Sequence, residues 1–135
     1  MAGTNEEVQV KELMTEGVIA VEQEKTVREA AQLLKEEDIR GLVVVDGEEA
    51  VGVVVCRDMV YNVVAEDKDP EKVLVKDIMS TDLVVADDDE LLDDVAMAMA
   101  RNDISRVPVV RDDMLVGILT QTDILRAWPG YAEVM

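Results

Sequence analysis

The feature that most constrains the fold of this chain is an internal duplication. Residues 10–60 align with residues 75–125 at a constant offset of 65 (75 minus 10), without any gap. Identical residues recur along the alignment, at Lys11/Lys76, Met14/Met79, Ala31/Ala96, Asp38/Asp103, Ile39/Ile104, Val44/Val109, Val45/Val110, Val51/Val116, Gly52/Gly117 and Asp58/Asp123. A repeat of this size is one supersecondary unit with an apolar face that it cannot bury alone. We therefore expect two copies that pack against each other, with a functional site where they meet.

Each copy contains one strongly amphipathic segment, which predicts a helix. In the first copy Thr26 and Glu29 have the spacing of a capping box. In the second copy Leu91 stands at the cap position, and the acidic residues 87–90 favour the positive end of the helix instead. The apolar residues of the two expected helices have helical spacing; they are Val27, Ala30, Ala31 and Leu34 in the first copy and Leu92, Val95, Ala96 and Met99 in the second, and we expect Met97 to pack as well.

Short apolar runs predict the strands. One strand is expected before each helix, at residues 18–21 and 83–86. After each helix, two β-branched runs flank a turn, LVVVD and VGVVV in the first copy and VPVVR and VGILT in the second, which predicts a largely buried hairpin. Pro108 cannot donate to a sheet ladder, so its end of the strand should lie at an edge or face a ligand. A last short helix near Asp58 or Asp123 completes a β-α-β-β-α unit in an α+β fold, and Trp128-Pro-Gly should end the second copy.

The repeat boundaries divide the chain into five parts. We expect an N-terminal extension at residues 1–9, a first repeat at 10–65, a linker at 66–74, a second repeat at 75–128 and a C-terminal tail at 129–135. The length of 135 residues suits one core built from both halves.

The charge balance excludes several classes of function. Acidic residues outnumber basic ones 31 to 13, for a net charge of −18, while 49% of residues are hydrophobic, so the chain should fold rather than stay disordered. Nucleic acids and anionic membrane surfaces attract basic proteins, so neither is an expected partner. The composition resembles that of proteins from salt-loving cytoplasms, where ions screen the repulsion; an ordinary acidic soluble protein is the alternative.

Metal, redox and export functions also lack sequence support. Cys56 is the single cysteine and there is no histidine, so no disulfide within the chain is possible and the usual metal ligands are missing. We expect Cys56 to be a small buried hydrophobic residue. The N-terminus has no basic stretch followed by an apolar run, and no segment has about 20 consecutive apolar residues, which predicts a cytoplasmic protein.

Three motifs give the chain a family resemblance. The segments VKELMT and VKDIMS, the run ISRVPVV and the sequence GILTQTD, which matches Gly-x-x-Thr/Ser-x-x-Asp, resemble the cystathionine β-synthase (CBS) domain. The duplication resembles the tandem CBS pair, or Bateman module. The resemblance implies two pseudo-symmetric β-α-β-β-α repeats packed sheet to sheet, pairs that often dimerise, and clefts between repeats that bind adenine nucleotides or adenosyl ligands.

By this resemblance, the main cleft lies at GILTQTD. Thr120 and Asp123 would contact the phosphate and ribose, and Arg106 could approach a phosphate. A hydroxyl three residues before a carboxylate, at the start of a helix, does offer a donor, an acceptor and an end that favours anions. The other residues assigned to this cleft are Val107 and Pro108, with Thr15, Val18 and Ala20 enclosing the base. The structural alternative is that Thr120 and Asp123 cap their helix and Arg106 pairs with a carboxylate.

The resemblance implies a second, degenerate cleft in the first copy. It would use Asp58, Arg40, Ser80, Leu83 and Val85. Val55 stands where the motif has threonine, and valine cannot donate a hydrogen bond, so this cleft should bind more weakly, differently or not at all. The structural alternative is that Asp58 caps its helix.

The leading functional hypothesis is a regulatory module that binds an adenosine-containing ligand, AMP, ADP, ATP or an S-adenosyl compound, between the two repeats. The chain has no effector domain, so its response should involve a regulated protein or self-association as a homodimer. The alternative is an interaction module with empty clefts that dimerises through its outer helices. An enzyme is the least favoured class, because no catalytic base or activated nucleophile is evident and no catalytic cofactor is implied.

Overall fold

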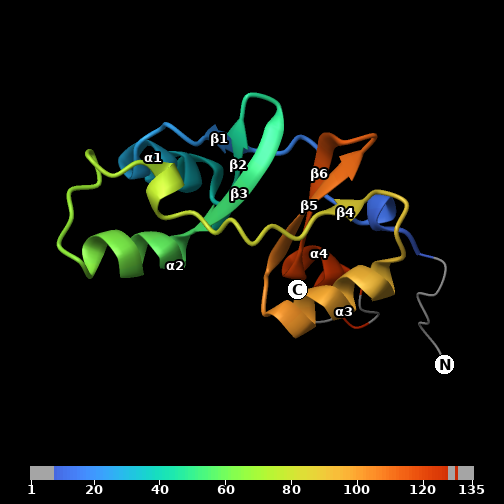
Figure 1. Ribbon diagram of the computed structural model, residues 1–135. Helices are drawn as coiled ribbons and strands as arrows, with labels where there is room; N and C mark the ends of the chain where they lie inside the picture. The colour runs from blue at the N-terminus through green and yellow to red at the C-terminus, as the bar shows by residue number, and fades with distance from the viewer. Residues whose placement is uncertain (1–7, 128–129, 131–135) are drawn as a thin grey trace. The chain divides into compact units, whose positions relative to one another are not determined.

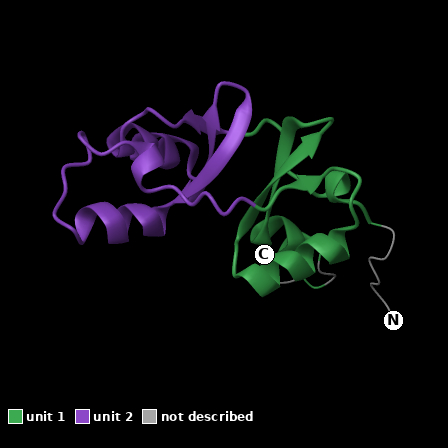
Figure 2. Ribbon diagram, viewed as in Figure 1, with its two compact units in different colours: residues 1–18, 84–135 green, residues 19–83 purple. Residues whose placement is uncertain are grey.

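The chain divides into two compact units, each built around its own sheet. The computed structural model describes residues 8–127 and 130 (Figure 1). Unit 1 comprises residues 1–18 and 84–135, and unit 2 comprises residues 19–83 (Figure 2). The mixed α+β fold expected from the sequence is confirmed, and both units have the order β-α-β-β-α.

The elements of the two units correspond one to one. Unit 2 contains β1 (Ala20–Glu22), α1 (Val27–Glu37), β2 (Gly41–Asp46), β3 (Glu49–Val55), α2 (Cys56–Met59) and the π-helix η2 (Val60–Val64). Unit 1 contains β4 (Ala86–Asp87), α3 (Leu92–Asn102), β5 (Arg106–Arg111), β6 (Met114–Thr120) and α4 (Gln121–Arg126). Two 3-10 turns, η1 (Val10–Glu12) and η3 (Val75–Asp77), precede them in the two repeats.

Both sheets have three strands and the same pairing. The orders are β1-β2-β3 and β4-β5-β6, with the first pair parallel and the second antiparallel. The expected first strands, at residues 18–21 and 83–86, lie one to three residues too early, since pairing begins only at Ala20 and Ala86. The residues before them are where the chain passes between the units, so their backbone does not pair with the sheet.

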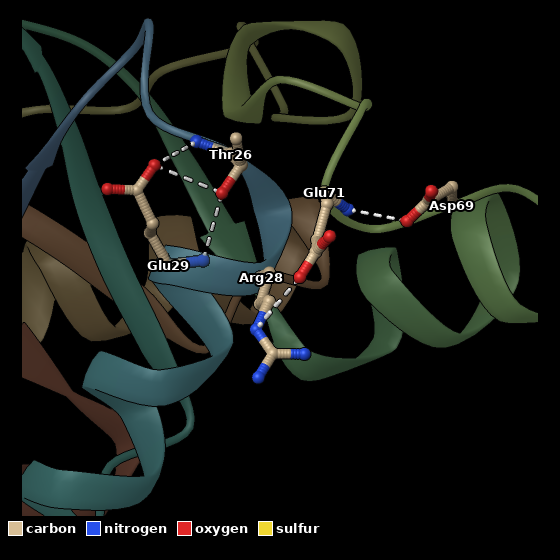
Figure 3. Close-up of polar contacts among 5 residues, drawn as sticks. All are labelled: Thr26, Arg28, Glu29, Asp69 and Glu71. Atoms are coloured by element: carbon tan, nitrogen blue, oxygen red, sulfur yellow. Dashed lines mark hydrogen bonds and ion pairs between the residues drawn. The ribbon is translucent and has the colours of Figure 1, made fainter.

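The two long helices begin differently, as their sequences predict. At α1 the Thr26 hydroxyl accepts from the Glu29 N–H at 3.1 Å, and the Glu29 carboxylate accepts from the Thr26 N–H at 3.1 Å (Figure 3). The bond from the Thr26 N–H, and next the bond that the Thr26 hydroxyl donates to the same carboxylate oxygen at 3.1 Å, lower the pKa of Glu29 from its ordinary value. At α3 the cap residue Leu91 makes no side-chain bond, and the N–H of Leu92 instead donates to the carbonyl of Val8 at 2.8 Å.

The linker between the repeats packs along the first turn of α1. The Arg28 N–H donates to the carbonyl of Pro70 at 3.0 Å, and Arg28 Nε lies 3.5 Å from a carboxylate oxygen of Glu71. Figure 3 shows this ion pair beside the Glu71 N–H, which donates to Asp69 at 2.9 Å. These groups are exposed, so they fix the course of the linker more than they stabilise the fold.

Each unit takes its leading segment from the other repeat. We call residues 10–18 and 75–83 the leading segments of the first and second repeats. Val10 is fully buried in the core cluster of unit 1, and Val75 is fully buried in that of unit 2. The core of each unit is therefore completed by the leading segment of the other repeat.

Two glycines allow each leading segment to lie close against a strand of the unit that it completes. Thr15 pairs with Ile118 on the outer edge of β6, and Ser80 pairs with Val53 on β3. A Cβ atom at Gly117 would lie 2.6 Å from the sulfur of Met14, and one at Gly52 would lie 2.7 Å from the sulfur of Met79. The identical glycines found in the alignment are thus the points at which a leading segment lies against a strand.

Some packing expectations need correction. Val27, Ala30 and Leu34 are buried in α1, but Ala31 is exposed, and Leu33 packs against the core in its place. In α3, Leu92, Val95 and Met99 are buried and Ala96 is partly buried, whereas Met97 is 53% exposed. Cys56, expected to be buried, is exposed because it is the first residue of α2 at the surface. The expected stop at Trp128 and Pro129 lies outside the described residues, and no helix within them is long and apolar enough to span a membrane.

The close approach at Gly117 generates a stability prediction. Gly117→Ala and Gly52→Ala should each lower the free energy of unfolding by about 1–3 kcal/mol, because a methyl group forces the leading segment away from the strand. Urea denaturation measures the effect. The control is Ser80→Ala, which removes an exposed hydroxyl beside the contact at Gly52 and should change the free energy of unfolding little. Unchanged stability of both glycine variants would contradict the close approach.

Candidate functional site

The candidate site forms where β6 ends and α4 begins. Thr120 is the last residue of β6 and the N-cap of α4, with extended dihedral angles (φ −115°, ψ 164°). The β5–β6 register places Arg106 opposite Thr120. Strand pairing therefore brings the arginine of ISRVPVV to the threonine of GILTQTD.

Thr120 and Asp123 form a complete capping box. The N–H and hydroxyl of Thr120 both donate to Asp123 Oδ2, at 2.9 and 3.1 Å, and the Asp123 N–H donates to the Thr120 hydroxyl at 3.2 Å. The helix-capping role considered for these residues is therefore present in the structure. It engages one of the two oxygens of the carboxylate.

The other carboxylate oxygen contacts two further side chains. The Thr15 hydroxyl donates to Asp123 Oδ1 at 3.2 Å, and Arg126 Nη1 lies 3.7 Å from the same oxygen. Asp123 is only 4% exposed, so its charge depends on these partners for stabilisation. Arg126 was missed in the sequence, although its position three residues after Asp123 in a helix was a usable signal.

Pro108 lies at an unpaired part of a strand edge, as expected. It is buried opposite Ile118 in β6, while the N–H and C=O of Ile118 both bond to Thr15 on the other side. The nitrogen of Pro108 therefore points away from β6, and β4 pairs only with Val109 and Val110. The absence of an N–H group on Pro108 therefore removes no hydrogen bond from the sheet.

The structure gathers most of the residues assigned to the main cleft in unit 1. Thr15, Arg106, Thr120 and Asp123 surround the start of α4, and Val107 is fully buried in β5 beside Arg106. Val18 is partly buried at the end of the first stretch of unit 1, whereas Ala20 belongs to β1 of unit 2.

The corresponding region of the first repeat has fewer polar contacts. Val55 is the N-cap of α2, and its N–H donates to Asp58 Oδ2 at 2.9 Å. Among the described residues, the Ser80 hydroxyl makes no bond to Asp58, although the Ser80 backbone pairs with Val53 as Thr15 pairs with Ile118. The capping bonds that need a threonine hydroxyl are lost with Val55.

Arg40, Leu83 and Val85 were also assigned to the second cleft, and Arg40 lies at the start of α2, where its carbonyl accepts from the Cys56 N–H at 3.0 Å. Gly41 pairs with Val55 as Arg106 pairs with Thr120, so the counterpart of Arg106 is Gly41, and Arg40 corresponds to Ser105. Leu83 is the last residue of unit 2, and Val85, which is 40% exposed, belongs to unit 1.

The acidic run at residues 87–90 is structural in the described part of the chain. Asp88, 8% exposed, accepts a 2.6 Å hydrogen bond from Arg111 Nε. No cluster of three or more metal-ligating side chains occurs among the described residues. Asp88 instead connects the end of β4 with the end of β5.

Comparison with known proteins identifies the family. The CBS domain profile matches residues 10–65 and 75–130, so the chain belongs to the CBS domain family and carries two copies. An uncharacterized protein of Methanopyrus kandleri is 33% identical over 124 residues, which span 90% of this chain and 63% of that protein. A second uncharacterized relative, from Methanocaldococcus jannaschii, is 33% identical, and the match covers 93% of this chain and 44% of its length. The chain thus spans about half to two thirds of these relatives.

Solved structures agree with this assignment. The CBS domain pair of protein MJ0100, in complex with 5′-methylthioadenosine and S-adenosyl-L-methionine, is 32% identical with a TM-score of 0.81, covering 91% of this chain and 97% of that one. A hexameric CBS-CP12 protein from bloom-forming cyanobacteria is 35% identical with a TM-score of 0.78, covering 87% and 69%. Tandem CBS pairs are in general regulatory, non-catalytic modules.

The unequal contacts of the two aspartates predict unequal effects on stability. Asp123→Ala should lower the free energy of unfolding by about 1–3 kcal/mol, because it leaves the partly buried Thr120 N–H and hydroxyl without their acceptor. Asp58→Ala, the matched variant, should cost about 0.5–1 kcal/mol through its single capping bond. Urea denaturation of both variants checks this, and equal losses would contradict the difference seen in the structure.

Proposed function

We propose that this chain is a regulatory module that binds an adenosine-containing ligand at the start of α4. The observation that carries the proposal is the buried carboxylate of Asp123, which lies beside the hydroxyl of Thr120, the residue that the β5–β6 register places opposite Arg106. In the proposal Asp123 accepts hydrogen bonds from the ribose hydroxyls, and Thr120 and Arg106 contact a phosphate when the ligand has one. In unit 1, Thr15 and Val18 of the leading segment are proposed to contact the base.

The chemistry of these groups suits such a ligand. A hydroxyl can rotate, so Thr120 can turn its proton from Asp123 Oδ2 toward a phosphate while the backbone N–H keeps the helix cap. Arg126, 3.7 Å from Asp123, offsets the carboxylate charge. The complex of the similar MJ0100 pair with 5′-methylthioadenosine and S-adenosyl-L-methionine supports an adenosine compound as the ligand class.

The net charge of −18 favours some of these ligands over others. Long-range repulsion lowers the local concentration of a polyanion such as ATP, whereas neutral 5′-methylthioadenosine and cationic S-adenosylmethionine meet no such barrier. AMP lies between these extremes. The region of Asp58 and Val55, with Arg40, Ser80, Leu83 and Val85 as further candidates, is proposed as a weaker second site.

A specific observation favours self-association as the second candidate function. Val60, Tyr61 and Val64 are 50%, 62% and 71% exposed on η2, and Leu125, the counterpart of Val60, is 58% exposed on α4. Exposed apolar side chains at equivalent positions of two repeats suit a symmetric contact with a second copy. The hexameric CBS-CP12 protein is an assembled relative. In this proposal dimerisation through these helices is either the response to a ligand or the function itself.

Isothermal titration with AMP, ATP, 5′-methylthioadenosine and S-adenosylmethionine tests the ligand proposal. Thr120→Val should lower the affinity for AMP about tenfold, through loss of a phosphate bond, and should change binding of 5′-methylthioadenosine much less. Asp123→Asn should weaken both ligands because both carry the ribose. Thr120→Ser and Asp58→Asn are the matched controls. Absence of binding by all four compounds would overturn the proposal.

Salt dependence separates repulsion from the contacts themselves. At low salt ATP should bind more weakly than AMP, and the difference should narrow as salt screens the acidic surface. A constant ratio of the two dissociation constants would mean that net repulsion does not limit ATP binding.

Sedimentation velocity tests the self-association proposal. A Val60→Glu, Val64→Glu variant should be monomeric at concentrations where the wild type is dimeric, because desolvating two charges opposes the contact. Asn62→Glu, an exposed change on the same helix, is the control and should leave the dimer intact. A wild type that is monomeric with and without the ligands above would exclude this candidate.

A further inference from the structure

Thr15 is attached to the candidate site through both its backbone and its side chain. Its N–H donates to the carbonyl of Ile118 at 2.9 Å, and the Ile118 N–H donates back to the Thr15 carbonyl at 3.0 Å. Its hydroxyl donates to Asp123 Oδ1 at 3.2 Å. The backbone bonds position the residue on β6, and the side-chain bond alone reaches the first turn of α4.

The two oxygens of Asp123 have separate roles. Oδ2 accepts both bonds from Thr120 and holds the start of the helix. Oδ1 accepts the Thr15 hydroxyl and lies 3.7 Å from Arg126. Since Oδ2 already accepts two hydrogen bonds, a ligand hydroxyl that leaves the helix cap intact must approach Oδ1, where it meets the Thr15 hydroxyl 3.2 Å from that oxygen.

The Thr15 bond is the most replaceable contact of the carboxylate. Its length of 3.2 Å is beyond the usual range for an O–H···O bond, about 2.5–3.0 Å, so it is weaker than average. Thr15 is exposed, so its hydroxyl can exchange the carboxylate for water at little cost. The Thr120 N–H bond at 2.9 Å, by contrast, belongs to the helix cap.

We infer that the bond from the Thr15 hydroxyl to Asp123 is a latch that competes with the ligand. The inference rests on the proposed function, since the competing group is a ribose hydroxyl at Asp123. Without ligand the Thr15 hydroxyl occupies Oδ1. When a ribose hydroxyl takes Oδ1, the Thr15 side chain is released from α4 while its backbone stays paired with Ile118.

The release acts on the segment that connects the two units. Thr15 lies three residues before the chain leaves unit 1 at Val18 (18 minus 15). Gly17, between them, has a φ of +68° and no atom within 4 Å of a Cβ built on it, so the space beside its Cα is open. Ligand binding at Asp123 is thereby coupled to the residues that lead into β1.

The first repeat provides an internal control. Ser80 has the same paired backbone, with bonds of 3.0 and 2.9 Å to Val53, and the same kind of hydroxyl. Asp58 accepts from the Val55 N–H, and within the described residues no bond joins it to the Ser80 hydroxyl. The latch is thus specific to Thr15 and Asp123.

Titration calorimetry with 5′-methylthioadenosine tests the latch in wild type, Thr15→Val, Thr15→Ser and Thr81→Val. Valine keeps the branched shape and the backbone pairing but cannot donate, so Thr15→Val should bind about three- to tenfold more tightly because no internal bond is lost on binding. Thr15→Ser keeps the donor, so it should show no gain over the wild type, and Thr81→Val, which removes an exposed hydroxyl outside both assigned sites, should bind like the wild type. Binding by Thr15→Val that is equal to or weaker than that of the wild type overturns the latch and leaves the proposed function standing.

A comparison of adenosine with 2′,3′-dideoxyadenosine identifies the competing group. The gain of Thr15→Val should appear with adenosine and vanish with the dideoxy compound, which has no hydroxyl to take Oδ1. An equal gain with both compounds would assign the effect to a loosened leading segment and overturn the latch. If neither the wild type nor Thr15→Val binds 5′-methylthioadenosine or adenosine, the proposed nucleoside site is wrong and the latch is overturned with it.

Discussion

The structure depends on the pairing of each leading segment with the last strand of the other repeat. Thr15 forms two backbone bonds to Ile118, and Ser80 forms two to Val53. These bonds cover a strand edge that would otherwise be open, and they bring Val10 and Val75 into the cores. Each unit is completed by the leading segment of the other repeat. Neither repeat therefore has its whole core within its own sequence.

The same pairing makes the two repeats chemically different. Both leading segments deliver a hydroxyl residue to the end of a hairpin, but only Thr15 faces a threonine–aspartate cap, since Val55 replaces the threonine in the first repeat. A fully satisfied polar cluster rigidifies its surroundings, and a partly satisfied one is costly. The second repeat therefore has the more defined polar site, and the first repeat keeps the scaffold.

The buried carboxylates of this strongly acidic protein lie beside arginine side chains. Asp123 and Asp88 are the buried carboxylates of the described residues, and each lies beside an arginine, Arg126 at 3.7 Å and Arg111 at 2.6 Å. The pairing of buried anions with some of the few basic residues leaves most of the negative charge on the solvated surface, where salt screens it. The electrostatic potential that a ligand would meet beside Asp123 therefore depends on Arg126 as well as on the net charge of the protein.

The sequence by itself determined the duplication, the order of elements, the capping box at Thr26 and most of the buried helix positions, because these features follow from local spacing and periodicity. The threonine–aspartate motif could also be recognised from the sequence, since its capping geometry spans only four consecutive residues. Only the tertiary structure decided that Thr15 bonds to Asp123, 108 positions apart, and that Cys56 is exposed. These outcomes depend on which strand edge a distant segment covers and on strand register, and no local pattern of residues encodes either.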